Sequence, residues 1–393
     1  AMTNEEHYQT AYQVSTEGIV LLKNESGKKQ PALLPIDGTR YNRILVVGDN
    51  ATRNLMQGGG SSELKVKTFI SPLDGLKAQL GDRISYAQGY MAGRPMYGYA
   101  DEIPQNVMDS LRNDAVDKAR QADMVIFIGG LNKNHYQDCE GGDRLSYALP
   151  FGQEQLIKEL YQANKNMVAV IVSGNAVAMP WINEVPAVVQ SWYLGTVGGQ
   201  ALADVLVGKV NPSGKLPFSY PVKLEDCPAH FYGEMSYPGD SIREEYKEDI
   251  LVGYRWYDTK KIKPLFPFGY GIGYTTYQYS KPVLSAKTMR AGETLSVSVK
   301  IRNTGKMAGK ETVQMYIGDE KCTVLRPEKE LKGFQKVELQ PGEEKEVVFT
   351  IHPEDLQFFD DKKHTWTVEP GKFKVYVSAS SADEHHTAEF EYL

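Results

Sequence analysis

The sequence predicts an α/β domain with a doubly wound, mostly parallel sheet, followed by an all-β sandwich of the immunoglobulin or fibronectin type III kind. Three observations carry this prediction. Short apolar runs alternate with helical patterns over the first half of the chain, which is typical of βαβ units. The alternation stops near residue 208, where Gly, Pro, Tyr and charged residues dominate. From residue 277 onward, strand patterns recur about every 8–14 residues, as they do in β-sandwiches.

The strands of the first domain are predicted from apolar runs that do not alternate, because a strand covered on both faces has no polar side. Such runs occupy residues 43–48, 84–87, 124–130, 167–174 and 188–192. Helical spacing of apolar residues predicts helices over residues 4–23, 72–80, 107–121 and 153–163, and a small-residue helix that ends at Val207.

The second half of the chain changes from turn-rich to strand-rich. Alternating apolar and polar residues predict strands at 295–301, 311–316, 345–351 and 372–377. We therefore expect an α/β domain over residues 1–222, a wrapping or linking segment over 223–276, and the β-sandwich over 277–393.

Composition excludes several classes of function. The chain has 393 residues and a formal net charge of −6, which argues against a nucleic-acid surface rich in Lys and Arg. We expect no membrane span, since no run of about 18 apolar residues occurs. The three cysteines and seven histidines form none of the spacings typical of metal sites, and we expect neither a metal nor a cofactor. The glycine-rich run at residues 58–62 lacks the lysine of a phosphate-binding P-loop.

The chemistry of the chain is concentrated in a charged loop at residues 132–153. This loop follows the predicted strand at 124–130, and open α/β sheets bind ligands at the carboxyl ends of their strands. Asp138 and Glu140 are one residue apart, so in an extended backbone their side chains would point to one side. A neighbouring like charge would raise the pKa of one of them, as general acid catalysis requires. Asp143 and Arg144 add an ion pair or a substrate clamp. A solvated acidic loop without catalytic function is the alternative interpretation.

The chain resembles family 3 glycoside hydrolases of the β-glucosidase and β-xylosidase type. The matching motifs run in order from about residue 10 to the C-terminus. They are EGIVLLKN (17–24), GGGSS (58–62), EGGDR (140–144), LP (149–150), NPSGKLP (211–217), VGYRWYD (252–258), PLFPFGYG (264–271), NTG (303–305), RPEKELKGF (326–334) and LQPGE (339–343).

The resemblance implies a three-part enzyme, with a (β/α)₈ barrel, an α/β sandwich and a fibronectin type III-like domain. This chain resembles the last two parts, and we expect a barrel N-terminal to it. The family's nucleophile is an aspartate of the barrel, which no residue here can replace. Its general acid/base is a glutamate that matches Glu140 best, with Asp138 as the second candidate. Ser61, Asn132, Asp143 and Arg144 are then expected to border the substrate cleft.

Three functional readings remain open from the sequence. The first is part of a retaining glycosidase that acts on a β-linked oligosaccharide or glycoside and is inactive as an isolated chain. The second is a non-catalytic carbohydrate-binding or scaffold protein of the same two folds. A third reading, in which Asp138 and Glu140 act together as a complete site, conflicts with the need for two carboxyl groups on opposite sides of the sugar. The resemblance also suggests a periplasmic or secreted bacterial location.

Overall fold

The computed structural model describes residues 4–27, 30–54, 56–94, 96–383 and 386–393. The chain divides into two compact units, Ala1–Gly214 and Lys215–Leu393, each with its own buried core. Within the described ranges, no helix is long and apolar enough to cross a membrane.

The first unit is built on a six-stranded sheet with the order β1-β6-β5-β4-β2-β3. Its strands are β1 (Val20–Asn24), β2 (Ile44–Val47), β3 (Ile84–Ala87), β4 (Met124–Gly130), β5 (Met167–Val172) and β6 (Ala187–Gln190). All neighbours pair in parallel except β1, which runs antiparallel to β6. Every residue of β2, β4, β5 and β6 is buried, which explains their continuous apolar sequences. The doubly wound α/β prediction is confirmed.

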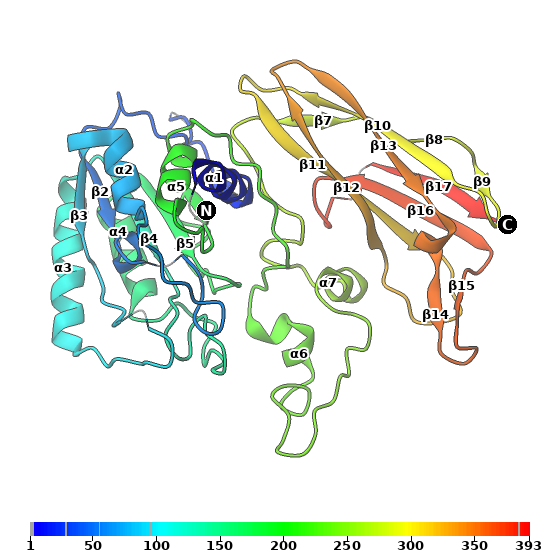
Figure 1. Cartoon of the computed structure of the whole chain (residues 1–393), viewed down its shortest axis with the longest axis horizontal. Helices are drawn as coiled ribbons and strands as arrows, with labels where there is room; N and C mark the ends of the chain where they lie inside the picture. Colours follow the sequence, from blue (N-terminus) through cyan, green and yellow to red (C-terminus); the bar gives the residue numbers. More distant parts are fainter. Residues whose placement is uncertain (1–3, 28–29, 55, 95, 384–385) are drawn as a thin grey trace. The chain divides into compact units, whose positions relative to one another are not determined.

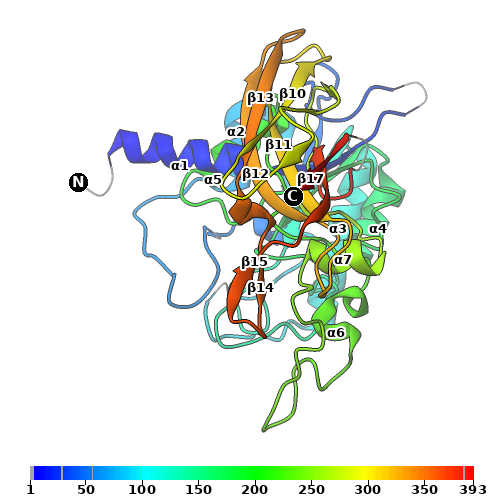
Figure 2. The same cartoon turned by 90° about the vertical axis from the view of Figure 1, so that its right-hand side faces the viewer.

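Helices cover both faces of this sheet (Figures 1 and 2). One group contains α1 (Glu5–Gly18), α2 (Pro72–Leu80) and α5 (Gly198–Leu206), and the other contains α3 (Gln105–Gln121) and α4 (Gln153–Ala163). Helices α2 and α5 approach at glycines. A Cβ on Gly75 would lie 2.0 Å from the carbonyl oxygen of Gly199. Since that distance is impossible for a real side chain, glycine at this crossing sets how closely the two helices pack.

The predicted helix over residues 4–23 is wrong in its last part. Helix α1 ends at Gly18, and the residues from Val20 to Asn24 form the edge strand β1. The run Val20-Leu21-Leu22 is almost completely buried against β6, whereas Val14, which fitted the helical pattern, is 68% exposed. A continuous aliphatic run is more compatible with a covered strand than with one stripe of a surface helix.

The second unit contains a β-sandwich, as predicted. One sheet has the order β13-β10-β7 with β8 also on β10, and the other has the order β12-β11-β16-β17-β9. The strands are β7 (Tyr277–Tyr279), β8 (Val283–Leu284), β9 (Thr288–Met289), β10 (Leu295–Asn303), β11 (Gly309–Asp319), β12 (Glu330–Leu339), β13 (Glu344–Ile351), β16 (Gly371–Ser378) and β17 (Thr387–Tyr392), and a hairpin of β14 (Phe358–Asp360) and β15 (Thr365–Thr367) lies outside the two sheets. Alternate residues of β10 enter the core, which accounts for the period of two in its sequence.

The turn-rich segment before the sandwich also contains helices that the sequence did not predict, α6 (Pro228–Phe231) and α7 (Tyr254–Lys260) (Figure 1). Ion pairs attach α7 to the sandwich. The ammonium group of Lys329, which is fully buried, lies 2.9 Å from the Asp258 carboxylate, and Arg255 lies 3.2 Å from Glu330. The backbone N–H of Leu331 donates to the Tyr254 hydroxyl at 2.8 Å. The motifs at 252–258 and 326–334 therefore meet in space.

We expect Gly75→Ala to lower the free energy of unfolding by about 1–3 kcal/mol, the usual cost of overpacking a close contact. The added methyl group would overlap the backbone of Gly199. Urea unfolding followed by circular dichroism measures the change. Gly18→Ala is the matched control, because a Cβ there meets nothing within 4 Å. Equal midpoints for the two variants would contradict this account of the α2–α5 crossing.

Candidate active site

Two loops meet at the carboxyl edge of the first unit's sheet. One follows β2 and contains residues 57–63, and the other follows β4 and contains residues 131–144. They are joined by a parallel bridge between Gly59 and Cys139. The N–H of Gly59 donates to the carbonyl oxygen of Asp138 at 2.8 Å, and the N–H of Glu140 donates to the carbonyl oxygen of Gly59 at 2.9 Å. The backbone of the first loop therefore fixes the backbone of the acidic loop.

The glycine-rich sequence of the first loop is explained by this close approach. A Cβ on Gly59 would lie 2.5 Å from the carbonyl oxygen of Lys133. Gly60 has a φ of +124°, and a Cβ there would lie 2.5 Å from the Cβ of Glu140. Any side chain at either position would push the loops apart. The run of glycines provides a surface against which Glu140 packs.

Glu140 is exposed, and its carboxylate accepts a hydrogen bond from the backbone N–H of Ser61, with 2.7 Å between N and Oε2. Hydrogen bonds from Ser61, from its backbone first and then from its side chain, lower the pKa of Glu140. The raised pKa expected from the neighbouring Asp138 is therefore wrong for this structure. The reason is that the Ser61 donors stabilise the carboxylate and outweigh desolvation, which acts in the opposite direction.

Asp138 is engaged elsewhere. Its carboxylate accepts hydrogen bonds from the N–H of Gly174 at 2.6 Å, the Asn175 amide at 2.7 Å and the Tyr193 hydroxyl at 2.7 Å. These donors follow β5 and β6, so Asp138 ties the acidic loop to the next two strands of the sheet. Burial, and then the charge of Asp138, raise the pKa of the Tyr193 phenol well above its ordinary value, which keeps the hydroxyl a donor.

The structure places the other predicted site residues in different settings. Asn132 is only 2% exposed, and its side chain bonds to the N–H of Asn134 and the carbonyl oxygen of Ala92. The Arg144 guanidinium donates to the Asn175 side chain and to the carbonyl oxygens of Ala176 and Tyr147. Asp143 and Ser61 are exposed beside Glu140 in the two loops. The side chains of Asn132 and Arg144 therefore bind other groups of the protein and stabilise the loops around the site.

Four further residues, which were not predicted from the sequence, hold the site together. Asn175 and Tyr193 bind Asp138, and Lys133 forms an ion pair with Glu63 that joins the two loops. Asn175 and Tyr193 each lie three residues beyond the last residue of a buried strand. Because the carboxyl ends of parallel strands share one edge, their positions were a usable signal.

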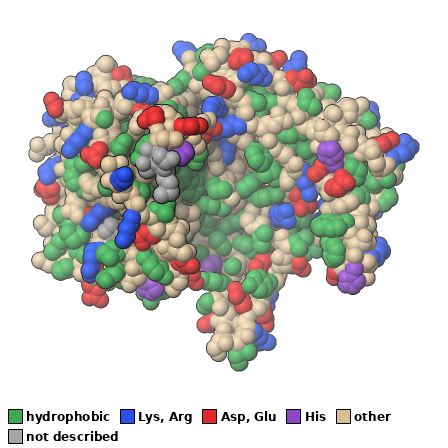
Figure 3. All heavy atoms as spheres, viewed as in Figure 1, with side chains coloured by type: hydrophobic (Ala, Val, Ile, Leu, Met, Phe, Trp, Pro, Cys, Tyr) green, Lys and Arg blue, Asp and Glu red, His purple; other side chains and the backbone are tan. Residues whose placement is uncertain are grey.

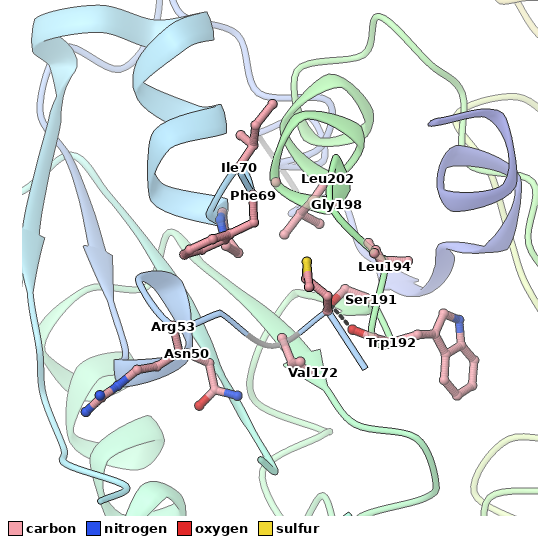
Figure 4. A pocket seen from close by; sticks show the side chains of 14 residues that line it. Asn50, Arg53, Phe69, Ile70, Val172, Ser191, Trp192, Leu194, Gly198 and Leu202 are labelled. Carbon is pink, nitrogen blue, oxygen red and sulfur yellow. Dashed lines mark hydrogen bonds between the residues drawn. The ribbon is translucent and has the colours of Figure 1, made fainter. Parts of the chain in front are cut away.

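A small cavity of about 40 Å³ lies under the same sheet edge, but it does not include Glu140. Apolar side chains such as Phe69, Leu194 and Leu202 line it, whereas Arg53 points away toward its partner Asp49 (Figure 4). The space suits a few water molecules and is far below the usual 300–1,000 Å³ of ligand pockets. It is not where a sugar would bind.

Charged side chains, and side chains of the types that bind metals, also lie elsewhere among the described residues. On the face shown in Figure 3, acidic and basic side chains are interspersed. Among the described residues, no three His, Cys, Asp or Glu side chains gather into a metal-binding group.

Comparison with known proteins identifies the family. Residues 19–274 match the glycosyl hydrolase family 3 C-terminal domain, and residues 311–381 match a fibronectin type III-like domain. The chain belongs to glycoside hydrolase family 3. The α/β part and the sandwich part predicted from its motifs are thereby confirmed.

Individual family 3 relatives are similar along the whole chain. The β-glucosidase BoGH3A of Bacteroides ovatus is 72% identical over 393 residues, which is 100% of this chain and 53% of that protein. The thermostable β-glucosidase B of Acetivibrio thermocellus is 38% identical over 96% of this chain and 47% of its own length. The crystal structure of a Bifidobacterium adolescentis family 3 β-glucosidase superposes with a TM-score of 0.86 at 34% identity and covers 100% of this chain and 54% of that one. The chain thus spans about half the length of these relatives.

We expect Asp138→Asn to weaken the anchoring of the acidic loop by about 1–3 kcal/mol, because its new NH₂ group would face donors instead of accepting from them. Hydrogen exchange at the Gly174 amide, which donates to Asp138, reports the local opening free energy. Glu140→Gln is the control. Its exposed amide oxygen can still accept from Ser61, so we expect a change below about 0.5 kcal/mol. Unchanged protection in Asp138→Asn would show that Asp138 does not anchor the loop.

Proposed function

We propose that this chain is the part of a retaining family 3 glycosidase that supplies the general acid/base, Glu140. The observation that supports this most directly is the division of labour between the two carboxylates. Asp138 is held by three donors that follow β5 and β6, whereas Glu140 is exposed on a loop whose backbone is bound to Gly59 at Asp138 and at Glu140 itself. A catalytic carboxyl group needs this combination of access and fixed position.

In this proposal the bond-making nucleophile is an aspartate outside the chain, on the barrel that the family resemblance implies. The aspartate attacks the anomeric carbon while Glu140 gives its proton to the departing glycosidic oxygen. Glu140 then takes a proton from water, and the resulting hydroxide equivalent releases the sugar from the aspartate. Retaining enzymes hold the two carboxyl groups about 5–5.5 Å apart.

Electrostatics explain why the chain should be inactive alone. The Ser61 hydrogen bonds favour the charged form of Glu140, which is the form required of a base and not of an acid. In the complete site the nucleophile would bring a second negative charge close to Glu140. A like charge at that distance raises the pKa of its neighbour, so the protonated acid becomes accessible only when both halves are present.

The names of similar proteins support a proposal for the substrate class. The relatives named above are β-glucosidases, and we propose a β-linked glucoside or related glycoside as the substrate. The competing reading is a carbohydrate-binding or scaffold protein without catalysis. A complete site made of Asp138 and Glu140 is disfavoured, because Asp138 is occupied by Gly174, Asn175 and Tyr193.

We expect the chain alone to hydrolyse neither 4-nitrophenyl β-glucoside nor 4-nitrophenyl β-xyloside. When it is fused to the N-terminal half of the Bacteroides ovatus relative, we expect activity on at least one of them. Glu140→Ala in the fusion should lower kcat/KM on the 4-nitrophenyl substrate about 10²–10⁴-fold, because general acid catalysis is lost. The loss should be smaller for 2,4-dinitrophenyl glycosides, whose leaving group needs little protonation.

Glu102→Ala, which removes an exposed carboxylate of the same unit, is the control and should retain activity. Turnover by the isolated chain that disappears in Glu140→Ala would overturn the half-site proposal. A fusion that is equally active with and without Glu140 would overturn the acid/base assignment. Sugar binding by an inactive fusion would favour the non-catalytic reading.

A further inference from the structure

We name the loop at residues 57–63 the glycine loop. It contacts Glu140 in two ways: the backbone of Ser61 donates a hydrogen bond to the carboxylate, and Gly60, which has no side chain, leaves room for the Glu140 side chain. The Ser61 N–H lies 2.7 Å from Oε2 of Glu140. At the preceding residue, a Cβ on Gly60 would lie 2.5 Å from the Glu140 Cβ and 2.6 Å from Oε2. The side chain of Glu140 therefore rests on Gly60 along its length and ends at a hydrogen-bond donor.

Two further contacts keep the glycine loop in register with the acidic loop. The bridge between Gly59 and Cys139 fixes the backbones. The ion pair between Glu63 and Lys133, whose side chain is only 12% exposed, joins the loops beyond Ser61. With its neighbours on both sides fixed, the Ser61 N–H has little freedom to leave the position that it holds over Glu140.

We propose that Ser61 is a positioning residue that holds Glu140 in its carboxylate, base-competent state, so that the glycine loop sets the protonation of the acid/base. The inference rests on the proposed function of Glu140. It gives Ser61 a role different from the substrate contact expected from its position in the sequence. It also explains why residue 60 is a glycine. A side chain there would prevent the Glu140 carboxylate from reaching the Ser61 N–H.

Three charged residues near Glu140, namely Asp138, Lys133 and Arg144, bind other partners, whereas Asp143 is exposed in the same loop. Asp138 accepts from three donors, and Lys133 is paired with Glu63. The His135 ring lies against the backbone of Gly142, where a Cβ would come within 2.5 Å of it. The Arg144 guanidinium donates to Asn175 and to the carbonyl oxygens of Ala176 and Tyr147. Ser61 is therefore the first group expected to control the carboxyl group, in agreement with the lowered pKa of Glu140.

The arrangement has opposite effects on the two half-reactions. A donor at Oε2 stabilises the carboxylate that takes a proton from water in the second step. The same donor opposes the protonated form that is required in the first step. Removing it should therefore move the basic limb of the kcat/KM profile, which reports the acid of the free enzyme, to higher pH.

The first test uses the isolated chain and needs no activity. In a pH series of ¹H–¹⁵N spectra, the Ser61 amide of the unmodified chain should titrate with Glu140, and this titration should disappear in Glu140→Gln. The side-chain carboxyl carbon of Glu140, observed directly by ¹³C, should titrate at higher pH in Gly60→Ala and in Ser61→Ala than in the unmodified chain. Ser62→Ala, which alters the neighbouring exposed hydroxyl, is the matched control and should leave the midpoint unchanged.

If Gly60→Ala does not fold, the titration of the Ser61 amide in the unmodified chain keeps the test decisive, because it reports the backbone donor directly. Ser61→Ala removes only the hydroxyl contribution and leaves the backbone N–H in place. We expect a smaller upward shift in that variant. A Glu140 midpoint that is the same in the unmodified chain, Ser61→Ala and Ser62→Ala, with a Ser61 amide that does not titrate, would overturn the inference.

The second test uses the fusion with the N-terminal half of the Bacteroides ovatus relative and separates this inference from the proposed function. If Glu140→Ala abolishes general acid catalysis and Ser61→Ala moves the basic limb of kcat/KM to higher pH, both stand. If Glu140→Ala has the expected effect but the basic limb is unmoved in both Gly60→Ala and Ser61→Ala, the positioning role is wrong and the proposed function survives. If Glu140→Ala has no effect, the proposed function fails, whatever the ¹³C titration shows about Ser61.

Discussion

The parallel pairing of Gly59 with Cys139 is the contact on which the candidate site depends. It is formed by two backbone hydrogen bonds, one to the carbonyl oxygen of Asp138 and one from the N–H of Glu140. A loop between a strand and a helix is ordinarily among the more mobile parts of a fold. Here an isolated bridge joins two loops that follow the neighbouring strands β2 and β4. This bridge holds the acidic loop in place without burying the carboxylate of Glu140.

The carboxylates of Asp138 and Glu140 differ in the number of hydrogen bonds that they accept. A carboxylate that accepts three hydrogen bonds is a strong structural tie, and Asp138 uses this to attach its loop to the residues after β5 and β6. One residue beyond Cys139, Glu140 accepts from Ser61 and remains open to solvent. In the proposed site, Asp138 therefore fixes the loop and Glu140 is the accessible carboxylate.

The fold could be predicted from the sequence where the burial of an element requires apolar residues along its whole length. Strands β2, β4 and β5 are covered on both faces, and their apolar runs located them closely. Strand β1 was missed because its aliphatic residues follow a helix directly and allow a helical reading. Helix α7 was missed because ion pairs to the sandwich, such as Lys329–Asp258, stabilise it, and these depend on a partner more than 70 residues away.

The site was predictable only in part, for a related reason. The position of Glu140 follows from the order of motifs and from the rule that strand ends gather at one edge. The choice between Asp138 and Glu140 does not follow from spacing, because both are acidic and both flank Cys139. What separates them is the number of donors that each receives from other strand ends, and those donors are brought together only by folding.

The proposed division of the site between two domains has a consequence for how the protonation of Glu140 is controlled. A general acid must carry its proton at the pH where the enzyme works, yet the donors within this chain favour the carboxylate. In the proposed site, the charge of a nucleophile on a second domain would favour the protonated acid. Retaining hydrolysis needs two carboxyl groups of unequal pKa, and in the proposed site the approach of the two domains would create that difference. The hydrogen bonds that lower the pKa of Glu140 are compatible with the proposed role, because the same residue acts as a base in the second step.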